Sequence, residues 1–269
     1  MTAPVSRSVV ESSTAPPVED STRSALVLDR VSKVYGTQGN SLHALDNITL
    51  DVKKGEFVCL LGASGCGKST LLNVVAGLDH PSAGTIDTGD AHTTLMFQES
   101  ALFPWLTARG NVELPLKIRK MPRAQRHKKA DELLDLVNLT AFAGKLPHEL
   151  SGGMRQRVAL ARCLAQEADV LLMDEPFGAL DAMTRDVLHE ELERLWRETG
   201  LTVIFVTHNV REAVRLGDRV VLLSSRPGRI VEEYPIDIER PRRLDSFDVA
   251  GLAATITDRL KEEVRRHGR

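Results

Sequence analysis

The chain alternates between short apolar runs and longer segments with helical spacing. Residues 47–52 alternate apolar and polar side chains, which is typical of a strand buried on one face. Residues 57–61 are apolar throughout, as expected of a strand covered on both faces. Further apolar runs bounded by turn residues predict strands at residues 26–34, 43–52, 94–97, 170–173, 202–207 and 219–223.

Helical patterns lie between these predicted strands. We expect helices over residues 68–78 and 183–199, and a mostly helical insertion at about residues 99–166. Strands that alternate with helices predict an α/β fold with a mainly parallel core sheet. The alternating strand near the start adds an antiparallel β subdomain. Four prolines are expected to break the helical insertion: Pro104, Pro115, Pro122 and Pro147.

Both ends of the chain differ from this central part. Residues 1–24 are rich in Ser, Thr and Pro and lack the apolar segment of a signal peptide, which predicts a disordered leader. The folded domain is expected over residues 25–235. Residues 236–269 are predicted to be a short tail, with a charged helical pattern at residues 256–266.

The composition narrows the class of protein. With 269 residues, 42% hydrophobic and 27% charged, the chain is typical of a globular protein with ample material for a core. Its net charge of −2 gives no electrostatic case for a nucleic-acid partner. No apolar stretch approaches the roughly 18 residues of a membrane span. Cys59, Cys66 and Cys163 are scattered without metal-like spacing, which fits a reducing cytoplasm.

A phosphate-binding motif, Gly-x4-Gly-Lys-Ser, occupies residues 62–69. Its glycines let backbone N–H groups approach phosphates closely, and the following helix presents its positive end. Lys68 is expected to reach the β and γ oxygens, and the Ser69 hydroxyl to coordinate Mg²⁺. A chance match is disfavoured by the buried strand before it and the helix after it. The predicted nucleotide-binding positions are Gly62, Ala63, Ser64, Gly65, Cys66, Gly67, Lys68, Ser69 and Thr70.

Two carboxylates end the apolar strand at residues 170–173. Asp174 suits the outer shell of Mg²⁺, and Glu175 suits the polarisation of an attacking water. An acidic loop at a strand end is common, so this interpretation depends on the phosphate motif upstream.

A second anion site is predicted at Ser151, Gly152 and Gly153, where a helical pattern begins. Ser151 fits an N-cap, and the first N–H groups of the helix are free to bind an anion. Alone, this pattern indicates no more than capping. One chain with both sites is typical of an ATPase that closes on its nucleotide as a dimer.

Together these motifs resemble the ATP-binding subunit of ABC transporters, over about residues 25–235. The resemblance implies a P-loop NTPase fold with ATP and Mg²⁺ as ligands. It implies that the Ser-Gly-Gly turn contacts the γ-phosphate held by the other subunit, although Met154 replaces the commonest Gln. It also implies catalytic roles for Glu175, Lys68 and His208, with His208 contacting the γ-phosphate.

Three more positions follow from the resemblance alone. Gln98 matches the glutamine that touches Mg²⁺ and senses the membrane partner, and Asp181 matches the loop that bridges the dimer. Tyr35 matches the aromatic residue that stacks on adenine. The alternative for Gln98 is an ordinary polar strand cap, and the alternative for Tyr35 is a packed strand tyrosine. A histidine at a strand end, such as His208, is more often structural.

The implied partners are a second ATPase subunit, identical or different, integral membrane permease subunits and, indirectly, a substrate-binding protein. The implied location is the cytoplasmic face of the cell membrane. Residues 97–107 and 150–157 resemble the nitrate, sulfonate and taurine importer group. An exporter or lipid-extracting complex, or a non-transport ABC ATPase, stays open as an alternative.

Overall fold

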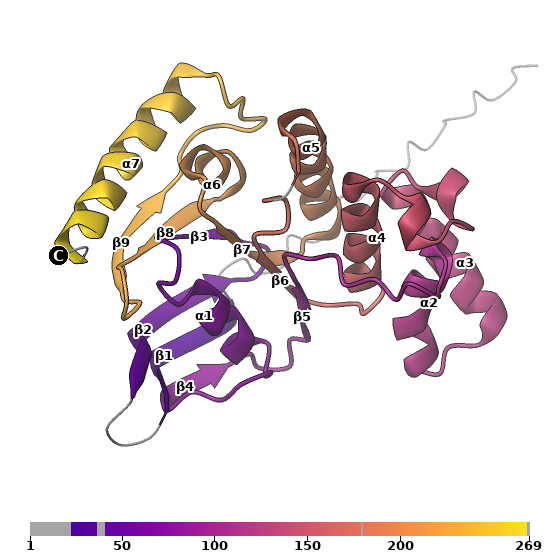
Figure 1. Ribbon diagram of the computed structural model, residues 1–269, viewed down its shortest axis with the longest axis horizontal. Coiled ribbons are helices and arrows are strands. Elements are labelled where there is room, and N and C mark those ends of the chain that lie inside the picture. Colours follow the sequence, from indigo (N-terminus) through magenta and orange to yellow (C-terminus); the bar gives the residue numbers. More distant parts are fainter. Residues whose placement is uncertain (1–22, 37–40, 179, 268–269) are drawn as a thin grey trace, which may run out of the picture.

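The computed structural model describes residues 23–36, 41–178 and 180–267. Residues 1–22 of the predicted leader lie outside the described residues. Two sheets and seven α-helices make up the described part (Figure 1).

The larger sheet is mainly parallel, as the sequence predicts. Its strands have the order β5-β6-β7-β3-β8-β9, and all neighbours are parallel except β9, which pairs antiparallel with β8 at the edge. The sequence missed β9, because its residues are at best half-buried. In sheet order the strands are β5 (Thr93–Met96), β6 (Val170–Asp174), β7 (Thr202–Thr207), β3 (Phe57–Leu61), β8 (Arg219–Leu223) and β9 (Ile230–Pro235).

The smaller sheet is antiparallel, with the order β2-β1-β4, which confirms the predicted antiparallel subdomain. It consists of β1 (Ser24–Tyr35), β2 (Leu42–Lys53) and β4 (Ala83–Asp87). The sequence missed β4, since four of its five residues are exposed and leave no apolar run.

Two hydrophobic clusters cover the two faces of the larger sheet. Alternate residues of β3 divide between them: Phe57, Cys59 and Leu61 belong to one cluster, and Val58 and Leu60 to the other. The second cluster also holds the inner face of the antiparallel sheet. Burial on both faces explains why this strand is apolar without alternation.

Helix α1 (Lys68–Val75) begins inside the phosphate motif and ends earlier than predicted. The N–H groups of Gly77 and Leu78 donate to the carbonyls of Val74 and Asn73, at 3.2 and 2.9 Å. This closure is typical of a helix C-terminus. Leu78, expected in the helix, lies beyond it and is 63% exposed.

The helical insertion forms a lobe of three α-helices, α2 (Ala108–Ile118), α3 (Arg123–Leu136) and α4 (Gly152–Leu164), which lie together at one end of the molecule (Figure 1). Pro115 does not break this lobe as expected, because α2 continues through it. Pro122 stands where α3 begins, as predicted for a breaker.

The later helices pack against the larger sheet. These are α5 (Ala182–Thr199), α6 (Val210–Leu216) and α7 (Phe247–His267). The sequence gives no prediction for α6, and α7 begins nine residues before the predicted helical pattern. Val249, Ala253 and Ile256 of α7 are buried in the main core. The segment predicted as a tail therefore contributes to the core.

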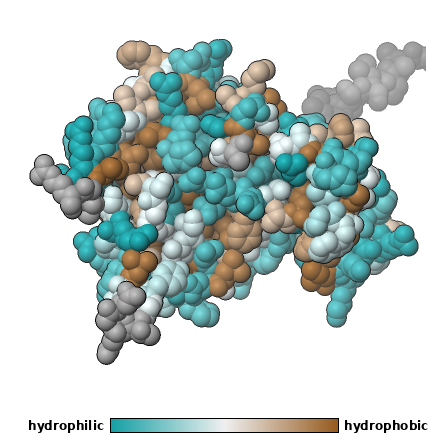
Figure 2. All heavy atoms as spheres, in the orientation of Figure 1, coloured by the Kyte–Doolittle hydropathy of each residue, from teal (hydrophilic) through white to brown (hydrophobic). Residues whose placement is uncertain are grey.

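Within the described residues, no helix is long and apolar enough to cross a membrane. The face in Figure 2 is mostly hydrophilic, with hydrophobic side chains in separate patches that include the helical lobe.

A buried arginine joins the segment after β9 to the end of α6. Arg242 is 5% exposed, and its guanidinium donates to the carbonyl oxygens of Val214, Gly217 and Ile236 at 3.1, 2.5 and 2.9 Å. Its Nε donates to the Ile238 oxygen at 2.7 Å. Burial, and then the charge of a neighbouring arginine, lower the Arg242 pKa to about 10. The side chain satisfies carbonyls that the helix end leaves without partners.

We predict that Arg242→Leu lowers the free energy of unfolding by about 3 kcal/mol, because several buried carbonyls lose a charged donor. Chemical denaturation measures the loss. The control is Arg243→Leu, since exposed Arg243 pairs with exposed Asp245 and with no other acid among the described residues. The control should keep the wild-type denaturation midpoint, and an equal midpoint for both variants would contradict the prediction.

Candidate active site

The phosphate motif forms a loop between β3 and α1, beside a cavity of about 380 Å³. Gly65 and Gly67 have φ angles of +75° and +109°. A Cβ on Gly67 would lie 2.6 Å from the Ala44 oxygen, so no other residue fits there. The loop directly follows the fully buried strand β3, which fixes the loop at the carboxyl end of that strand.

Lys68 lies at the base of this loop and is 5% exposed. Its Nζ donates to the oxygens of Gly62 and Ala63, at 2.8 and 3.0 Å. Cys66 Sγ is 3.9 Å away, and burial raises the pKa of that thiol. Within the described residues, Lys68 forms no ion pair, so a buried positive charge faces a cavity without a matched anion. A phosphate group fits this arrangement.

Oxygen ligands for a divalent cation line the same cavity. Ser69, Gln98 and Asp174 all belong to its wall. Burial raises the pKa of the Asp174 carboxyl, whereas a hydrogen bond from Ser69 acts in the opposite direction. The described residues hold no cluster of three or more His, Cys, Asp or Glu side chains that could bind a metal. This donor set fits Mg²⁺, which prefers one or two carboxylates together with substrate oxygens and water.

A carboxylate–imidazole pair lies next to these residues. Glu175 follows β6 with a φ of +43°, and its N–H donates to the Val206 oxygen of β7 at 3.0 Å. Glu175 Oε2 lies 2.9 Å from His208 Nδ1. The carboxylate is 23% exposed and the imidazole 62%, so the pair is open to solvent on the His208 side.

Tyr35 lies at the cavity wall with Leu42 and Thr70. Its hydroxyl donates to Asp79 Oδ2 at 2.9 Å, and Lys33 Nζ lies 4.9 Å from the ring centre. Burial is the main cause of the raised pKa of this hydroxyl. The ring is fixed at its polar end while part of it remains exposed.

The structure does not bring the Ser-Gly-Gly turn to this cavity. Ser151 accepts from the Met154 N–H at 3.3 Å and begins α4, as predicted. A Cβ on Gly153 would meet Thr184 Cγ2 at 2.5 Å, so the turn packs against the start of α5. Asp181 caps α5 by accepting from the Thr184 N–H at 3.0 Å. The described residues that line the cavity include neither Ser151 nor Asp181.

Sequence reasoning gave no role to three side chains that shape the site. Gln156 Nε2 of α4 donates to the backbone carbonyl oxygen of Gln98 at 2.8 Å. Arg162, also of α4, donates to the oxygens of Ser100 and Ala101 at 2.9 and 2.7 Å. These bonds tie the segment after β5 to the helix that begins with the Ser-Gly-Gly turn. Both residues stand within a helical pattern whose partners the sequence cannot show.

Arg226 is the third. Its Nε and Nη2 both donate to the Gly65 oxygen at 3.1 Å, and it lines the cavity. It comes from the loop between β8 and β9, far along the chain from Gly65, and no motif marks it.

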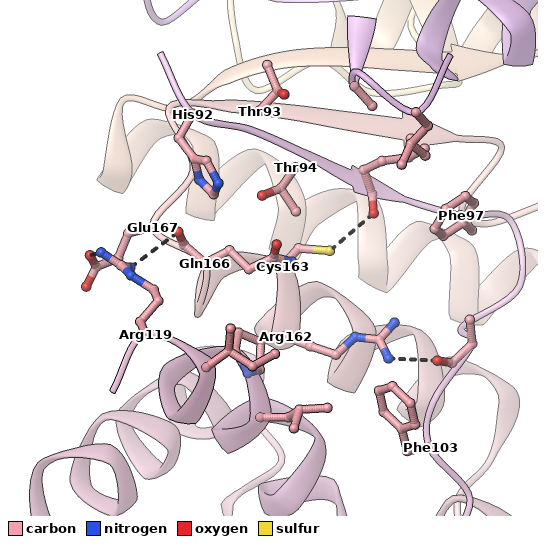
Figure 3. A pocket seen from close by; sticks show the side chains of 17 residues that line it. His92, Thr93, Thr94, Phe97, Phe103, Arg119, Arg162, Cys163, Gln166 and Glu167 are labelled. Atoms are coloured by element: carbon pink, nitrogen blue, oxygen red, sulfur yellow. Dashed lines mark hydrogen bonds and ion pairs between the residues drawn. The ribbon is translucent and has the colours of Figure 1, made fainter. Parts of the chain in front are cut away.

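A separate cavity of about 790 Å³ lies between β5 and the helical lobe (Figure 3). Phe97, Phe103 and the guanidinium of Arg162 lie toward one end, and Arg119 and Glu167 toward the other. Phe97 and Phe103 are 46% and 37% exposed. This groove has two aromatic side chains beside Arg162 at one end and the Arg119–Glu167 ion pair at the other.

Comparison with known proteins shows the family. Residues 45–178 match the family described as ABC transporter. The uncharacterized ABC transporter ATP-binding protein MJ0412 of Methanocaldococcus jannaschii is 44% identical over 246 residues, which cover 89% of this chain and 92% of that protein. The taurine import ATP-binding protein TauB of Roseobacter denitrificans is 49% identical over 203 residues, covering 73% and 76%.

A solved structure agrees with these relatives. It is the dimeric, post-hydrolysis state of the ATP-binding cassette MJ0796 bound to ADP and Pi, with a TM-score of 0.69 and 36% identity, covering 80% of this chain and 100% of that one. The chain belongs to the ABC transporter ATP-binding proteins. It binds ATP and is an ATPase, and its predicted fold class is confirmed.

We predict that Arg226→Leu raises the Kd for ATP about fivefold, since the phosphate loop loses two hydrogen bonds worth about 1 kcal/mol. Titration with a fluorescent ATP analogue measures the change. Arg229→Leu is the control, because this exposed arginine of the same loop pairs with Asp46 and lies outside the cavity wall. A Kd raised equally in both variants would argue against the role of Arg226.

Proposed function

We propose that this chain is the ATP-hydrolysing subunit of an ABC importer for a small oxyanion or organosulfur compound, of the nitrate, sulfonate and taurine type. The observation that carries the catalytic part is that Glu175 lies at the wall of the phosphate cavity and pairs with His208 at 2.9 Å. The importer part is supported by relatives whose names denote taurine import.

In this scheme, Glu175 accepts a proton from the attacking water, and His208 holds Glu175 and contacts the γ-phosphate. Lys68 and the loop from Gly62 to Thr70 bind the β- and γ-phosphates, and Tyr35 stacks on adenine. Ser69, Gln98 and Asp174 hold Mg²⁺. When bound, Mg²⁺ neutralises charge on the phosphate oxygens.

We further propose that the site is completed by a second copy of the chain or a related subunit. The Ser-Gly-Gly turn does not line the chain's own cavity, although its first helical N–H groups suit an anion. Supplied in trans, Ser151, Gly152 and Gly153 would contact the γ-phosphate in the partner's loop. Asp181 lies beside this turn and is proposed at the same interface, where its carboxylate also caps α5.

We place the docking site of the permease at the groove between β5 and the helical lobe. The groove begins directly beside Gln98, and Gln156 and Arg162 tie that segment to α4. Movement of a membrane partner in the groove would therefore reach both Gln98 and the Ser-Gly-Gly turn. We therefore propose that the chain is a peripheral subunit at the cytoplasmic face of the cell membrane.

We predict that Glu175→Gln lowers kcat for ATP hydrolysis at least 100-fold, because loss of a general base costs about 10²–10⁴. With ATP present, the variant should accumulate as a dimer. Phosphate release and light scattering after size-exclusion chromatography measure the two effects. Glu198→Gln is the control, since this exposed residue pairs with Arg194 away from the site. A Glu175 variant that neither dimerises nor loses turnover would refute the scheme.

We predict that Phe103→Asp reduces copurification with the membrane permease about tenfold or more, as expected for a charge placed at an apolar contact. The two subunits are expressed together, purified through a tag on the permease and quantified. Phe142→Asp is the matched control, because Phe142 has similar exposure, 40%, and lies on the lobe outside the groove. Melting temperatures of both variants exclude unfolding, and equal copurification would contradict the docking site.

The substrate requires a different experiment, since this subunit carries ATP chemistry alone. Copurification of the permease and its binding protein, followed by a screen of nitrate, sulfonates and taurine against the binding protein, identifies it. Binding of none of these by a functional binding protein would overturn the proposed substrate class.

A further inference from the structure

A network of buried polar side chains lies next to the segment that carries His208. His189 of α5 is 1% exposed, and its Nε2 lies 2.5 Å from Glu212 Oε1 of α6. The second oxygen of Glu212 accepts a hydrogen bond from the Thr207 hydroxyl at the end of β7. Glu212 and Thr207 are 6% and 3% exposed. Three separate elements therefore meet through side chains that water does not reach.

This network ends at Thr207, next to His208, the proposed catalytic histidine. Thr207 immediately precedes His208, and the Thr207 hydroxyl accepts from the Asn209 N–H at 3.0 Å. The Asn209 side chain in turn accepts from the Glu212 N–H at 3.3 Å. Side-chain and backbone hydrogen bonds thus fix the residues on both sides of His208.

His189 also contacts the loop that follows Glu175. The His189 ring packs edge-on against Phe177, with ring centres 5.6 Å apart and an interplanar angle of 62°. Phe177 is 1% exposed and stands two residues after Glu175. His189 therefore contacts, directly or through Glu212, both segments that carry the catalytic pair.

A carboxylate can only accept hydrogen bonds, so the contact between His189 Nε2 and a Glu212 carboxylate has the histidine as its donor. Among the described residues, His189 is the one basic side chain paired with Glu212. The neighbouring Arg215 pairs instead with Asp186 and Glu190. Without His189, a buried carboxylate would keep only the Thr207 hydroxyl and would draw Thr207 out of place.

We propose that His189 is a positioning residue for ATP hydrolysis, which acts through Glu212 and Thr207 to hold His208 against Glu175. The inference rests on the roles proposed above for Glu175 and His208. Helix α5 also packs at its first turn against Gly153, so one helix contacts both the Ser-Gly-Gly turn and the support of His208. Among the described residues, those that line the cavity do not include His189, so we expect nucleotide binding not to depend on it.

His189→Phe tests the proposal, because phenylalanine keeps a ring beside Phe177 and removes the donor. We expect kcat to fall about tenfold and the KM for ATP to stay within twofold, since a misplaced catalytic group costs rate more than binding. His189→Gln restores an N–H donor and should recover most of the loss. Phosphate release by the full chain gives kcat and KM, and a fluorescent ATP analogue gives binding.

Thr207→Val removes the hydroxyl at the other end of this network and keeps the side-chain volume nearly constant. It provides the test if His189→Phe does not fold. It should also lower kcat about tenfold. The double variant of His189 and Thr207 should lose no more than the larger single loss, because both changes break one connection. The proposal would be overturned if the losses of kcat multiplied in the double variant, or if His189→Gln had no higher kcat than His189→Phe. A kcat of Thr207→Val within twofold of the wild type would also overturn it.

Two further variants separate this inference from the proposed function. His127→Phe is the matched control, because His127 pairs with Glu113 at 2.7 Å in the helical lobe; its kcat should equal that of the wild type, and an equal fall would overturn the proposal. His208→Ala is measured in parallel. If His208→Ala and Glu175→Gln lose turnover and the His189 and Thr207 variants do not, only the present inference fails. If His208→Ala keeps wild-type turnover, the role proposed for His208 fails, and this inference with it.

Discussion

The parallel pairing of β3, β6 and β7 is the constraint on which the site depends. These strands pair in register, Leu61 with Thr207 and Asp174 with Val206, so their carboxyl ends meet at one edge of the sheet. The phosphate loop, the two acidic residues and His208 each follow one of these ends. Because all three strands are covered on both faces, a register slip would draw the polar residues that follow them into the buried layers. Hydrophobic burial thus sets the distance between the proposed catalytic groups, which are far apart in sequence.

The helical lobe shares the main hydrophobic cluster with this sheet, and polar contacts join it to the segment after β5. Gln156 and Arg162 of α4 hold the backbone of the segment after β5, while the first turn of α4 packs against α5. A displacement of α4 therefore changes the surroundings of Gln98 and of the Ser-Gly-Gly turn together.

The errors of prediction have physical causes. The strands β4 and β9 have mostly exposed side chains, so they leave no apolar pattern and are formed by backbone pairing with neighbours. Helix α7 begins before its charged pattern because Val249 and Ala253 are buried by contact with the core, which a local pattern does not show. Pro115 lies inside α2 although proline usually ends a helix. Local sequence patterns predicted the strands that are completely buried. They failed for elements whose formation depends on backbone pairing or on packing against distant residues.

The sequence by itself determined the phosphate loop, the carboxylates after β6, the cap at Ser151 and the α/β class, because these depend on residue type, spacing and burial within short segments. The tertiary structure alone decided which carbonyls Arg226 and Arg242 bind, that Gln98 is tied to α4, and that His189 reaches Thr207 through Glu212. These contacts join segments distant along the chain. Their geometry is fixed by packing around the sheet, and no spacing in the sequence records it.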